Sequence, residues 1–339
     1  MDPVDAVALA RQLIDIDSTT GREGEVARVL AGYLRDRGYS VLEQPVDGAA
    51  GGDRINVIAA VGEPQVVFST HFDCVPPFFP SRLEGGVLFG RGACDAKGIL
   101  AAQVAAAERL RVGGESRIGL VFVAGEERGS DGAMAANRIA SRSRYLINGE
   151  PTDNRLGAAT RGVFRVRIAT EGKAAHSGYP QLGRSAIEAL IDVLVSMRGA
   201  PWPEDALLGR THYTVGLISG GVAPNVIPAQ AEAEIIFRTV GAHDEVRVVL
   251  AATVGERARI TEVLEVPPVH LETRDGFETG VFAYTTDIPF LPAWGTPLLL
   301  GPGSIHVAHT DEEHIRLTEL VEAVDLYSTL AATLLASDG

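Results

Sequence analysis

The sequence has little cysteine, no long apolar run and no block of charge of one sign. Its two cysteines, Cys74 and Cys94, cannot form a disulfide framework for 339 residues, and they fit a reducing compartment. No apolar run approaches the ~18 residues that a membrane-spanning helix needs. After Met1 the chain also lacks the basic segment and apolar core of a secretory signal. We therefore expect a cytoplasmic protein.

The formal net charge is −14, and the acidic residues are spread along the chain. This excess argues against a nucleic acid or a membrane as a partner, because nucleic acids and anionic membranes are themselves negative. Hydrophobic residues make up 46% and charged residues 22% of the chain, as in ordinary folded domains. The length exceeds what one hydrophobic core usually serves, which predicts two domains or one large domain with an insertion.

Three common catalytic motifs are also absent. The chain contains no HExxH zinc helix, no Walker A phosphate loop and no GxSxG nucleophile elbow. These absences argue against a serine hydrolase or a nucleotide-dependent enzyme.

Helices and short apolar strands alternate over the first part of the chain. Asp2 and Pro3 predict the start of a first helix, and Gly38 predicts the end of a second. The predicted strands are "YSVLEQPV", "NVIAAV", "QVVFST", "RIGLVFVAGEE" and "YLINGEP", and a further helix is predicted over 130–140. This alternation predicts an α/β domain with a mostly parallel sheet and helices on both faces. In such sheets, ligands bind beyond the carboxyl ends of the strands.

The pattern changes after residue 160. From there the order is strand, helix, strand, strand, helix, strand, which predicts a small α+β domain of the split βαβ kind. The first pattern returns after residue 267 with the strand "PLLLGPG" and a helix over 317–336. We therefore predict a catalytic domain of residues 1–160 and 268–339, interrupted by a smaller domain of residues 161–267.

Imidazole and carboxylate side chains lie at the predicted strand ends. They are His71, Asp73, Glu126, Glu127 and Glu150, with Asp95 in the Gly-rich loop between them. Any one alone is typical of a solvated strand end, but their co-occurrence favours one shared site. A mixture of imidazole and carboxylate ligands suits zinc, cobalt or manganese.

The spacing of these residues predicts different roles for them. His71 and Asp73 are two positions apart, so on a strand they point to the same face and the carboxylate can orient the imidazole. Glu126 and Glu127 are adjacent and point apart on a regular strand, so one can bind metal while the other moves protons. Two divalent ions with three carboxylates and one hydroxide form a nearly neutral site, which a buried cavity tolerates.

Seven motifs along nearly the whole chain resemble those of one enzyme family and occur in the same order. They are "THFDCVP", "GRGACDAKG", "AGEERGSDG", "NGEPT", "HSGYPQLGRSAIEAL", "GGVAPNVIPAQAEAEIIFR" and "LGPGSIHVAHTDEEHI". The family is that of the co-catalytic zinc aminoacylases and carboxypeptidases, which includes acetylornithine deacetylase, succinyl-diaminopimelate desuccinylase, aminoacylases and glutamate carboxypeptidases. The sequence departs from the family pattern at Ser185 and Cys74, which stand where asparagine and valine are usual.

The resemblance implies a centre of two divalent metal ions, with zinc expected and cobalt or manganese as alternatives. In this centre Asp95 would bridge both ions. His71 and Glu150 would complete the ligands of one ion, and Glu127 and His309 those of the other. His309 is preferred to His306 and His314 because it directly precedes "TDEE". Glu126 would be the general base and Asp73 the partner that orients His71.

The resemblance also implies that the inserted domain is a lid and a dimerisation domain. His176 would reach the active site of a partner subunit and stabilise the oxyanion, so that a homodimer would be needed for activity. Arg238 would bind the substrate carboxylate, with Asn225 and the backbone of Gly303 and Ser304 nearby.

These assignments predict a metal-dependent amidohydrolase that cleaves N-acyl-L-amino acids and most resembles acetylornithine deacetylase. A desuccinylase or a dipeptidase or carboxypeptidase of the same family is the alternative, with a small N-acyl amino acid or short peptide as substrate. A protein of another class, a catalytically idle binding protein on the same fold, stays open as well.

Overall fold

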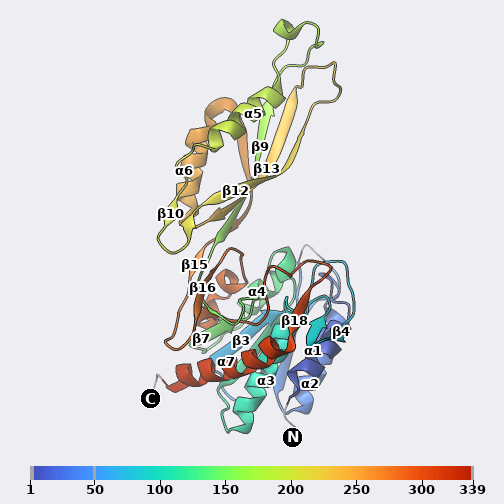
Figure 1. The fold of residues 1–339 in the computed structure, drawn as a ribbon, viewed down its shortest axis with the longest axis vertical. Coiled ribbons are helices and arrows are strands. Elements are labelled where there is room, and N and C mark those ends of the chain that lie inside the picture. The colour runs from blue at the N-terminus through green and yellow to red at the C-terminus, as the bar shows by residue number, and fades with distance from the viewer. Residues whose placement is uncertain (1–3, 49–50, 337–339) are drawn as a thin grey trace. The chain divides into compact units, whose positions relative to one another are not determined.

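The computed structural model describes residues 4–48 and 51–336. The chain forms two compact units, which Figure 1 shows as a ribbon. Unit 1 comprises Met1–Ala158, Leu271–Gly280 and Thr286–Gly339, and unit 2 comprises Ala159–His270 and Val281–Thr285. The segment 161–267, predicted as an inserted domain, falls within unit 2.

Unit 1 is built on a six-stranded sheet with the order β1-β2-β6-β3-β7-β17. The strands are β1 (Ser40–Pro45), β2 (Ile55–Ala60), β3 (Val66–His71), β6 (Ile118–Val123), β7 (Tyr145–Asn148) and β17 (Thr296–Leu299). β6, β3, β7 and β17 run parallel, whereas β1 and β2 add an antiparallel edge. The carboxyl ends of the four parallel strands therefore meet at one edge, where the sequence places its polar residues.

Helices and turns cover both faces of this sheet, as predicted. One face packs against α1 (Ala6–Ile14), α2 (Gly24–Asp36), α3 (Lys97–Val112) and α7 (Leu317–Ala336). The other packs against α4 (Asp131–Ala136) and the short turns η4 (Ile288–Phe290) and η5 (Pro292–Trp294). Phe68 on β3 points into the first core and Val67 into the second, as the two-residue period of a strand requires.

The helix ends differ from the prediction in two places. Asp2 and Pro3 lie outside the described residues, and α1 begins at Ala6 with Asp5 as its N-cap; an oxygen of Asp5 accepts the backbone N–H groups of Val7 and Ala8. The helix predicted over 130–140 is shorter, since α4 ends at Ala136. By contrast, Gly38 follows α2 with φ +88°, the left-handed conformation expected of a C-terminal glycine.

Unit 2 contains an antiparallel four-stranded sheet with the order β12-β13-β9-β14. Its elements are β9 (Gly162–Glu171), α5 (Ala186–Met197), β12 (His212–Gly220), β13 (Gln230–Thr239), α6 (His243–Val254) and β14 (Arg259–Val266). This is the predicted split βαβ order. One face of the sheet packs its apolar side chains against α5 and α6, whereas the other carries charged residues such as Arg167 and Glu232.

The remaining strands are short. They are β4 (Arg82–Glu84), β5 (Val87–Phe89), β8 (Leu156–Thr160), β10 (Glu204–Asp205), β11 (Gly209–Arg210), β15 (Val269–His270), β16 (Thr279–Phe282) and β18 (His314–Arg316). Across residues 4–48 and 51–336, no helix combines the length and the hydrophobicity that crossing a bilayer requires.

Candidate functional site

Two groups of metal-ligand-type side chains lie at the carboxyl-terminal edge of the unit 1 sheet. The first is His71, Asp95 and Glu150, and the second is Asp95, Glu127 and His309. Within each group the donor atoms lie within 4.8 Å of one another. Asp95 belongs to both groups, which is the arrangement expected of a carboxylate that bridges two cations.

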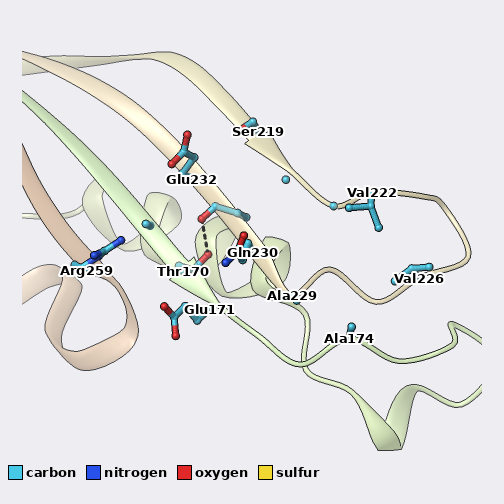
Figure 2. Close-up of a pocket in the computed structure, with 14 residues that line it drawn as sticks. Thr170, Glu171, Ala174, Ser219, Val222, Val226, Ala229, Gln230, Glu232 and Arg259 are labelled. Atoms are coloured by element: carbon cyan, nitrogen blue, oxygen red, sulfur yellow. Dashed lines mark hydrogen bonds between the residues drawn. The ribbon is translucent and has the colours of Figure 1, made fainter.

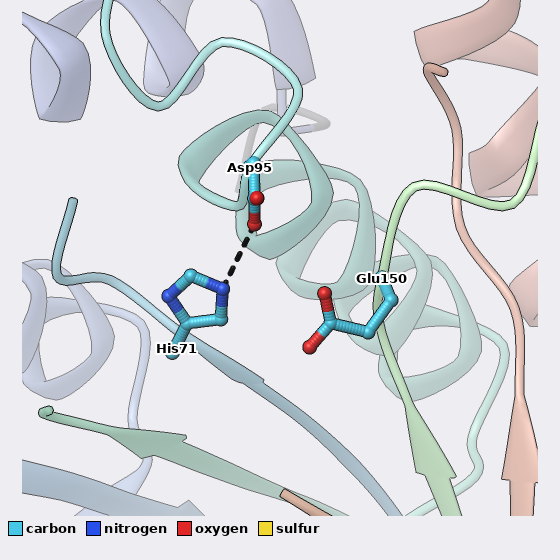
Figure 3. Close-up of side chains that lie close together, drawn as sticks. All are labelled: His71, Asp95 and Glu150. Carbon is cyan, nitrogen blue, oxygen red and sulfur yellow. Dashed lines mark hydrogen bonds and ion pairs between the residues drawn. The ribbon is translucent and has the colours of Figure 1, made fainter. Parts of the chain in front are cut away.

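Parallel strands and one loop supply the first group (Figure 3). His71 is the last residue of β3, and Glu150 follows β7, the neighbouring strand, by two positions. Asp95 comes from the Gly-rich loop before α3, and its Oδ1 lies 2.9 Å from Nε2 of His71. Side chains from distant parts of the sequence meet here because the ends of adjacent parallel strands share one edge of the sheet.

Asp73 lies beside the group, just past the end of β3 rather than on the strand as predicted. Its Oδ1 is 3.4 Å from Nδ1 of His71, and its backbone oxygen is 3.0 Å from the same nitrogen. The carboxylate also accepts the Thr20 hydroxyl and the backbone N–H groups of Glu126 and Glu127. Asp73 thus contacts His71, as predicted, and also holds the turn that carries both glutamates.

Glu126 and Glu127 lie on a 3₁₀ turn, η1 (Glu126–Arg128), and the prediction of a regular strand there is wrong. β6 ends at Val123, and Gly125 has φ +80°, a conformation that ends an extended strand. The two side chains therefore separate through a turn and not through strand alternation. Glu127 joins the second donor group, whereas Glu126 stays outside both groups.

His309 is the histidine, of the three near the end of the chain, that joins the donors. Its Nε2 is 3.0 Å from Glu127 Oε1 and 3.3 Å from Asp95 Oδ2. His306 is exposed, and His314 lies against Phe89 and pairs through Nδ1 with the carbonyl of Glu312. The side chain of His309 is 50% exposed, whereas His71 is 1% exposed, so solvent reaches the cluster from the His309 side.

Burial and mutual repulsion perturb the carboxylates. Burial raises the pKa of Glu126 and of Glu150 well above the ordinary value, and neighbouring carboxylates raise both further. Burial alone would lower the pKa of His71, but hydrogen bonds with Asp73 and Asp95 outweigh it and raise that pKa. Hydrogen bonds with Asp95 and Glu127 raise the pKa of His309 to about 10. The cluster carries more negative charge than its own histidines balance.

These residues fit divalent cations. The donors are imidazole nitrogen and carboxylate oxygen, the set that zinc, cobalt and manganese accept. Oε1 of Glu150 is buried without a hydrogen-bond partner among the described residues, a costly state that a bound cation removes. The two cysteines do not contribute, because burial raises the pKa of Cys74 to about 12 and raises the pKa of Cys94 well above its ordinary value, which keeps both as neutral thiols.

Glu313 was missed in the sequence, although it belongs to the motif "HTDEEH". Its fully buried Oε1 accepts the backbone N–H groups of Gly92, Cys94 and Asp95, and its Oε2 lies 2.6 Å from Arg91. One carboxylate thus holds the loop that presents Asp95. The acidic run around Glu313 resembles a solvated surface, so the pattern gave no sign of its burial.

Asp287 was also missed, because no motif surrounds it. It is 1% exposed, and neither of its oxygens has a hydrogen-bond partner in the described part of the chain. Burial raises the pKa of Asp287 to about 6. The neighbouring carboxylates of Asp73 and Glu127 raise this pKa further, whereas the positive charge of His71 lowers it. Asp287 is therefore an additional buried acid within the electrostatic reach of the donor groups.

The family profile "Peptidase family M20/M25/M40" matches residues 67–333, a span that includes all of these donors. The chain belongs to this family. As a member of the M20/M25/M40 peptidases, it is a metal-dependent hydrolase of peptide or amide bonds. The expected relationship to zinc aminoacylases and carboxypeptidases is thereby confirmed.

Curated relatives and solved structures of M20 peptidases extend over most of the chain. A peptidase M20 domain-containing protein of Schizosaccharomyces pombe is 36% identical over 96% of this chain and 83% of its own length. A probable carboxypeptidase of Aspergillus terreus is 37% identical over 94% of this chain and 84% of its own length. The crystal structure of a tripeptidase from Staphylococcus aureus has a TM-score of 0.81 at 18% identity, and it covers 98% of this chain and all of the other.

The remaining predicted residues of this M20 peptidase divide between the units. Gly303 and Ser304 lie in unit 1 against the Asp95 loop, where the Ser304 carbonyl accepts the Cys94 thiol at 3.6 Å. His176 and Asn225 lie in unit 2 on paired segments, since the Ser177 N–H donates to the Asn225 carbonyl.

His176 and Arg238 differ in what they contact within unit 2. The Gly178 N–H donates to Nδ1 of His176 at 3.0 Å, which leaves Nε2 as the protonated nitrogen of a neutral ring. Arg238, on β13, is half-buried and has no ion pair with any described residue. His176 therefore offers one N–H donor, and Arg238 a guanidinium without a counter-ion.

A pocket of about 680 Å³ on unit 2 carries no comparable donor cluster (Figure 2). Its polar residues include Thr170, Glu171, Glu232 and Arg259, from β9, β13 and β14. The Thr170 hydroxyl is already hydrogen-bonded to the carbonyls of Ala186 and Ala231. The chemistry of this M20 peptidase is thus concentrated at the donor groups of unit 1.

Proposed function

We propose that the chain is a two-metal exopeptidase that cleaves the amide bond of short peptides or N-acyl amino acids next to a free carboxylate. The observation that carries this proposal is the sharing of Asp95 between two three-donor groups. The similarity to a probable carboxypeptidase and to a tripeptidase favours peptides over acetylated amino acids as substrates. Acetylornithine deacetylase and desuccinylase activities stay predictions.

We assign the metal ligands as the sequence predicted. His71, Asp95 and Glu150 would hold one ion, and Asp95, Glu127 and His309 the other, with zinc as the expected metal. When bound, the ions would lower the pKa of a water molecule and polarise the carbonyl of the scissile amide.

Glu126 is the proposed general base. It lies on η1 next to the ligand Glu127, and the Asp73 carboxylate fixes its backbone. In this role Glu126 takes a proton from the attacking water and delivers it to the nitrogen of the leaving amine, so one carboxylate serves both steps. A raised pKa, caused first by burial, favours the protonated form that the second step needs.

We further propose roles in substrate binding for residues of unit 2. We assign the Nε2–H of His176 to the developing oxyanion, and Arg238 with Asn225 to the substrate carboxylate. The backbone of Gly303 and Ser304 would contact the same substrate. These roles follow from the family resemblance and are supported by the free donors of His176 and Arg238.

We further propose a homodimer formed through unit 2. β12 is an edge strand of the unit 2 sheet, so one side of its backbone pairs with no other strand among the described residues. Leu217 and Ile218 on this strand are 67% and 60% exposed. Such exposure of neighbouring large apolar side chains on an edge strand is typical of a surface that binds another protein chain. A second copy of β12 would pair with the backbone and cover both side chains.

A substrate panel tests the proposed reaction. Dipeptides, tripeptides, N-acetyl-L-amino acids including acetylornithine, and succinyl-diaminopimelate are incubated with the zinc-loaded and the cobalt-loaded protein, and released amine is measured. We expect peptides with a free carboxyl terminus to be cleaved fastest. Binding of a panel member without release of amine from any of them would instead support the idle binding protein. A cytoplasmic location stays a prediction.

A further inference from the structure

The guanidinium of Arg54 lies buried against the turn that leads into η1. Arg54 immediately precedes β2, and its side chain is fully buried. Nη1 lies 2.8 Å from Oδ2 of Asp131, the first residue of α4. Nε lies 3.4 Å from Oε1 of Glu23, which immediately precedes α2. One guanidinium therefore links the starts of a strand and of two helices.

The third nitrogen of this guanidinium, Nη2, lies against the backbone of Gly125. Nη2 has no hydrogen-bond acceptor among the described residues, so ion pairing does not account for its place. A Cβ atom at position 125 would stand 1.7 Å from Nη2 and 3.0 Å from Cζ, whereas non-bonded heavy atoms prefer about 3.5–4 Å. Gly125 also has φ +80°, a conformation that favours glycine. The absence of a side chain at Gly125 thus gives the guanidinium its place.

The residues that follow Gly125 are held at a second point. The Asp73 carboxylate accepts the backbone N–H groups of Glu126 and Glu127. Arg54 contacts the turn directly before these two residues. The turn that carries both glutamates is therefore fixed by an anion along η1 and by a cation at its start.

We propose that Arg54 is a positioning residue for the general base, and that its guanidinium fixes Gly125 and through it Glu126 and Glu127. This inference rests on the proposed function. The flat shape of the group is needed as well as its charge, because an ammonium group is a point charge that cannot pair with Asp131 and also support Gly125. A displaced η1 changes the second donor group, which contains Glu127, but not the first, which contains no residue of η1.

Arg54→Lys tests the need for the guanidinium. The variant keeps a positive charge between the two carboxylates, so neither is left as an unpaired buried charge. With the fastest substrate of the panel and saturating zinc, we expect kcat to fall about 10–100-fold and KM to change less than twofold. Arg28→Lys, at an exposed pair with Asp53, is the control and should leave kcat unchanged. An unchanged kcat in Arg54→Lys would overturn the proposal.

A zinc titration tests the same inference without turnover. Calorimetry on the metal-free protein should show one zinc affinity lowered about tenfold in Arg54→Lys and the other unchanged. In a His309→Gln background, which removes a donor of the second group, Arg54→Lys should leave the remaining affinity unchanged. An equal fall at both sites would contradict the proposal, because it would indicate a general loosening of the unit. If no panel substrate is cleaved, the proposed reaction is wrong, whereas a selective fall in one affinity still supports the positioning of η1 by Arg54.

A pair of glycine variants tests the contact from the other side, and does so even if Arg54→Lys folds poorly. Gly125→Ala alone should weaken the same single zinc site, and its effect should be smaller in the Arg54→Lys background, where the overlapping guanidinium is gone. Gly129→Ala is the matched control, since Gly129 has φ +115° and no atom near its missing Cβ. Its effect should be the same in both backgrounds. Effects of Gly125→Ala that are equally large in both backgrounds would show that the contact with Arg54 does not position the turn.

Discussion

The Asp73 carboxylate contacts both His71 and the backbone of η1. It contacts Nδ1 of His71 and accepts the N–H groups of Glu126 and Glu127, so it links a proposed ligand to the turn that carries the proposed base. Its pKa is lowered because hydrogen bonds from His71, Thr20 and the η1 backbone outweigh the effect of burial. An ionised Asp73 therefore orients both parts of the site.

Replacement of Glu126 by glutamine should separate metal binding from catalysis. The amide keeps the size of the side chain but cannot take a proton, and Glu126 belongs to neither donor group. We expect kcat to fall by about 10²–10⁴-fold while two ions per chain remain bound. Steady-state kinetics and metal analysis by mass spectrometry check this. Substantial residual turnover at full metal content would remove Glu126 from the role of base.

Asp287 should make the metal-free protein less stable as pH rises from about 4 to about 6. Burial raises the pKa of Asp287 to about 6, above its ordinary 3.8, so the folded state holds a proton that the unfolded chain releases earlier. The free energy of unfolding then falls with rising pH over this window, by roughly 3 kcal/mol.

The Asp287→Asn variant isolates this contribution. It should lack that part of the slope in urea unfolding curves measured at a series of pH values. Asp311→Asn, at an exposed position, is the matched control and should behave like the wild type. If the free energy of unfolding has the same pH dependence in the wild type and in Asp287→Asn, proton binding by Asp287 is not its cause.

At the scale of elements, the loop before α3 depends on a segment more than 200 positions later. Glu313 accepts three backbone N–H groups of this loop and pairs with Arg91, and β18 then pairs with β5. The loop itself is rich in glycine and has no regular structure of its own. The contacts with Glu313 therefore determine the shape of this loop and the position of Asp95.

Glu313→Gln should weaken both metal sites together. The amide oxygen still accepts N–H groups, but the charge that pairs with Arg91 is lost and an N–H₂ group faces the guanidinium. Because Asp95 is common to both donor groups, we expect both metal affinities to fall by about 10–100-fold, as measured by calorimetric titration. Glu312→Gln, at the exposed neighbour, is the control. A loss confined to one site would contradict the role of Glu313 in holding the shared carboxylate.

Periodicity predicted most elements well, and local chemistry explains the exceptions. β12, β13 and α7 lie where their patterns placed them, because a packed face repeats along each of them. The strand before Glu126 was predicted too long, since its apolar run gives no sign of the left-handed Gly125. Glu313 and Asp287 were missed because burial of a lone carboxylate depends on contacts between remote segments, which no local pattern records.

For the whole molecule, removal of metal should lower stability. The donor groups place buried carboxylates close together, and bound divalent cations would relieve their repulsion. At a metal concentration of 100 times Kd, each site adds about 2.7 kcal/mol to the free energy of unfolding, so chelation should lower Tm by several degrees. Differential scanning calorimetry measures this, and zinc should restore Tm whereas calcium should not. An unchanged Tm after verified removal of zinc would argue against metal in the folded protein.

The proposed dimer makes a second prediction at this scale. Leu217→Lys with Ile218→Lys places two charges on the exposed edge strand and should convert a particle of two chains into one of 35.8 kDa, as measured by light scattering. Val248→Lys, on α6 and also strongly exposed, is the control and should leave the mass unchanged. A monomeric wild type would refute the dimer.

The order of the donors along the chain has a consequence for biosynthesis. His71, Asp95 and Glu150 all precede unit 2, whereas His309 follows it. A ribosome therefore delivers every donor of the first group before the inserted unit is made, and the second group stays incomplete until translation has passed residue 309. The last parallel strand, β17, arrives equally late. The nascent polypeptide thus contains all donors of the first group before those of the second are complete, and in the interval Asp95 belongs to the first group alone.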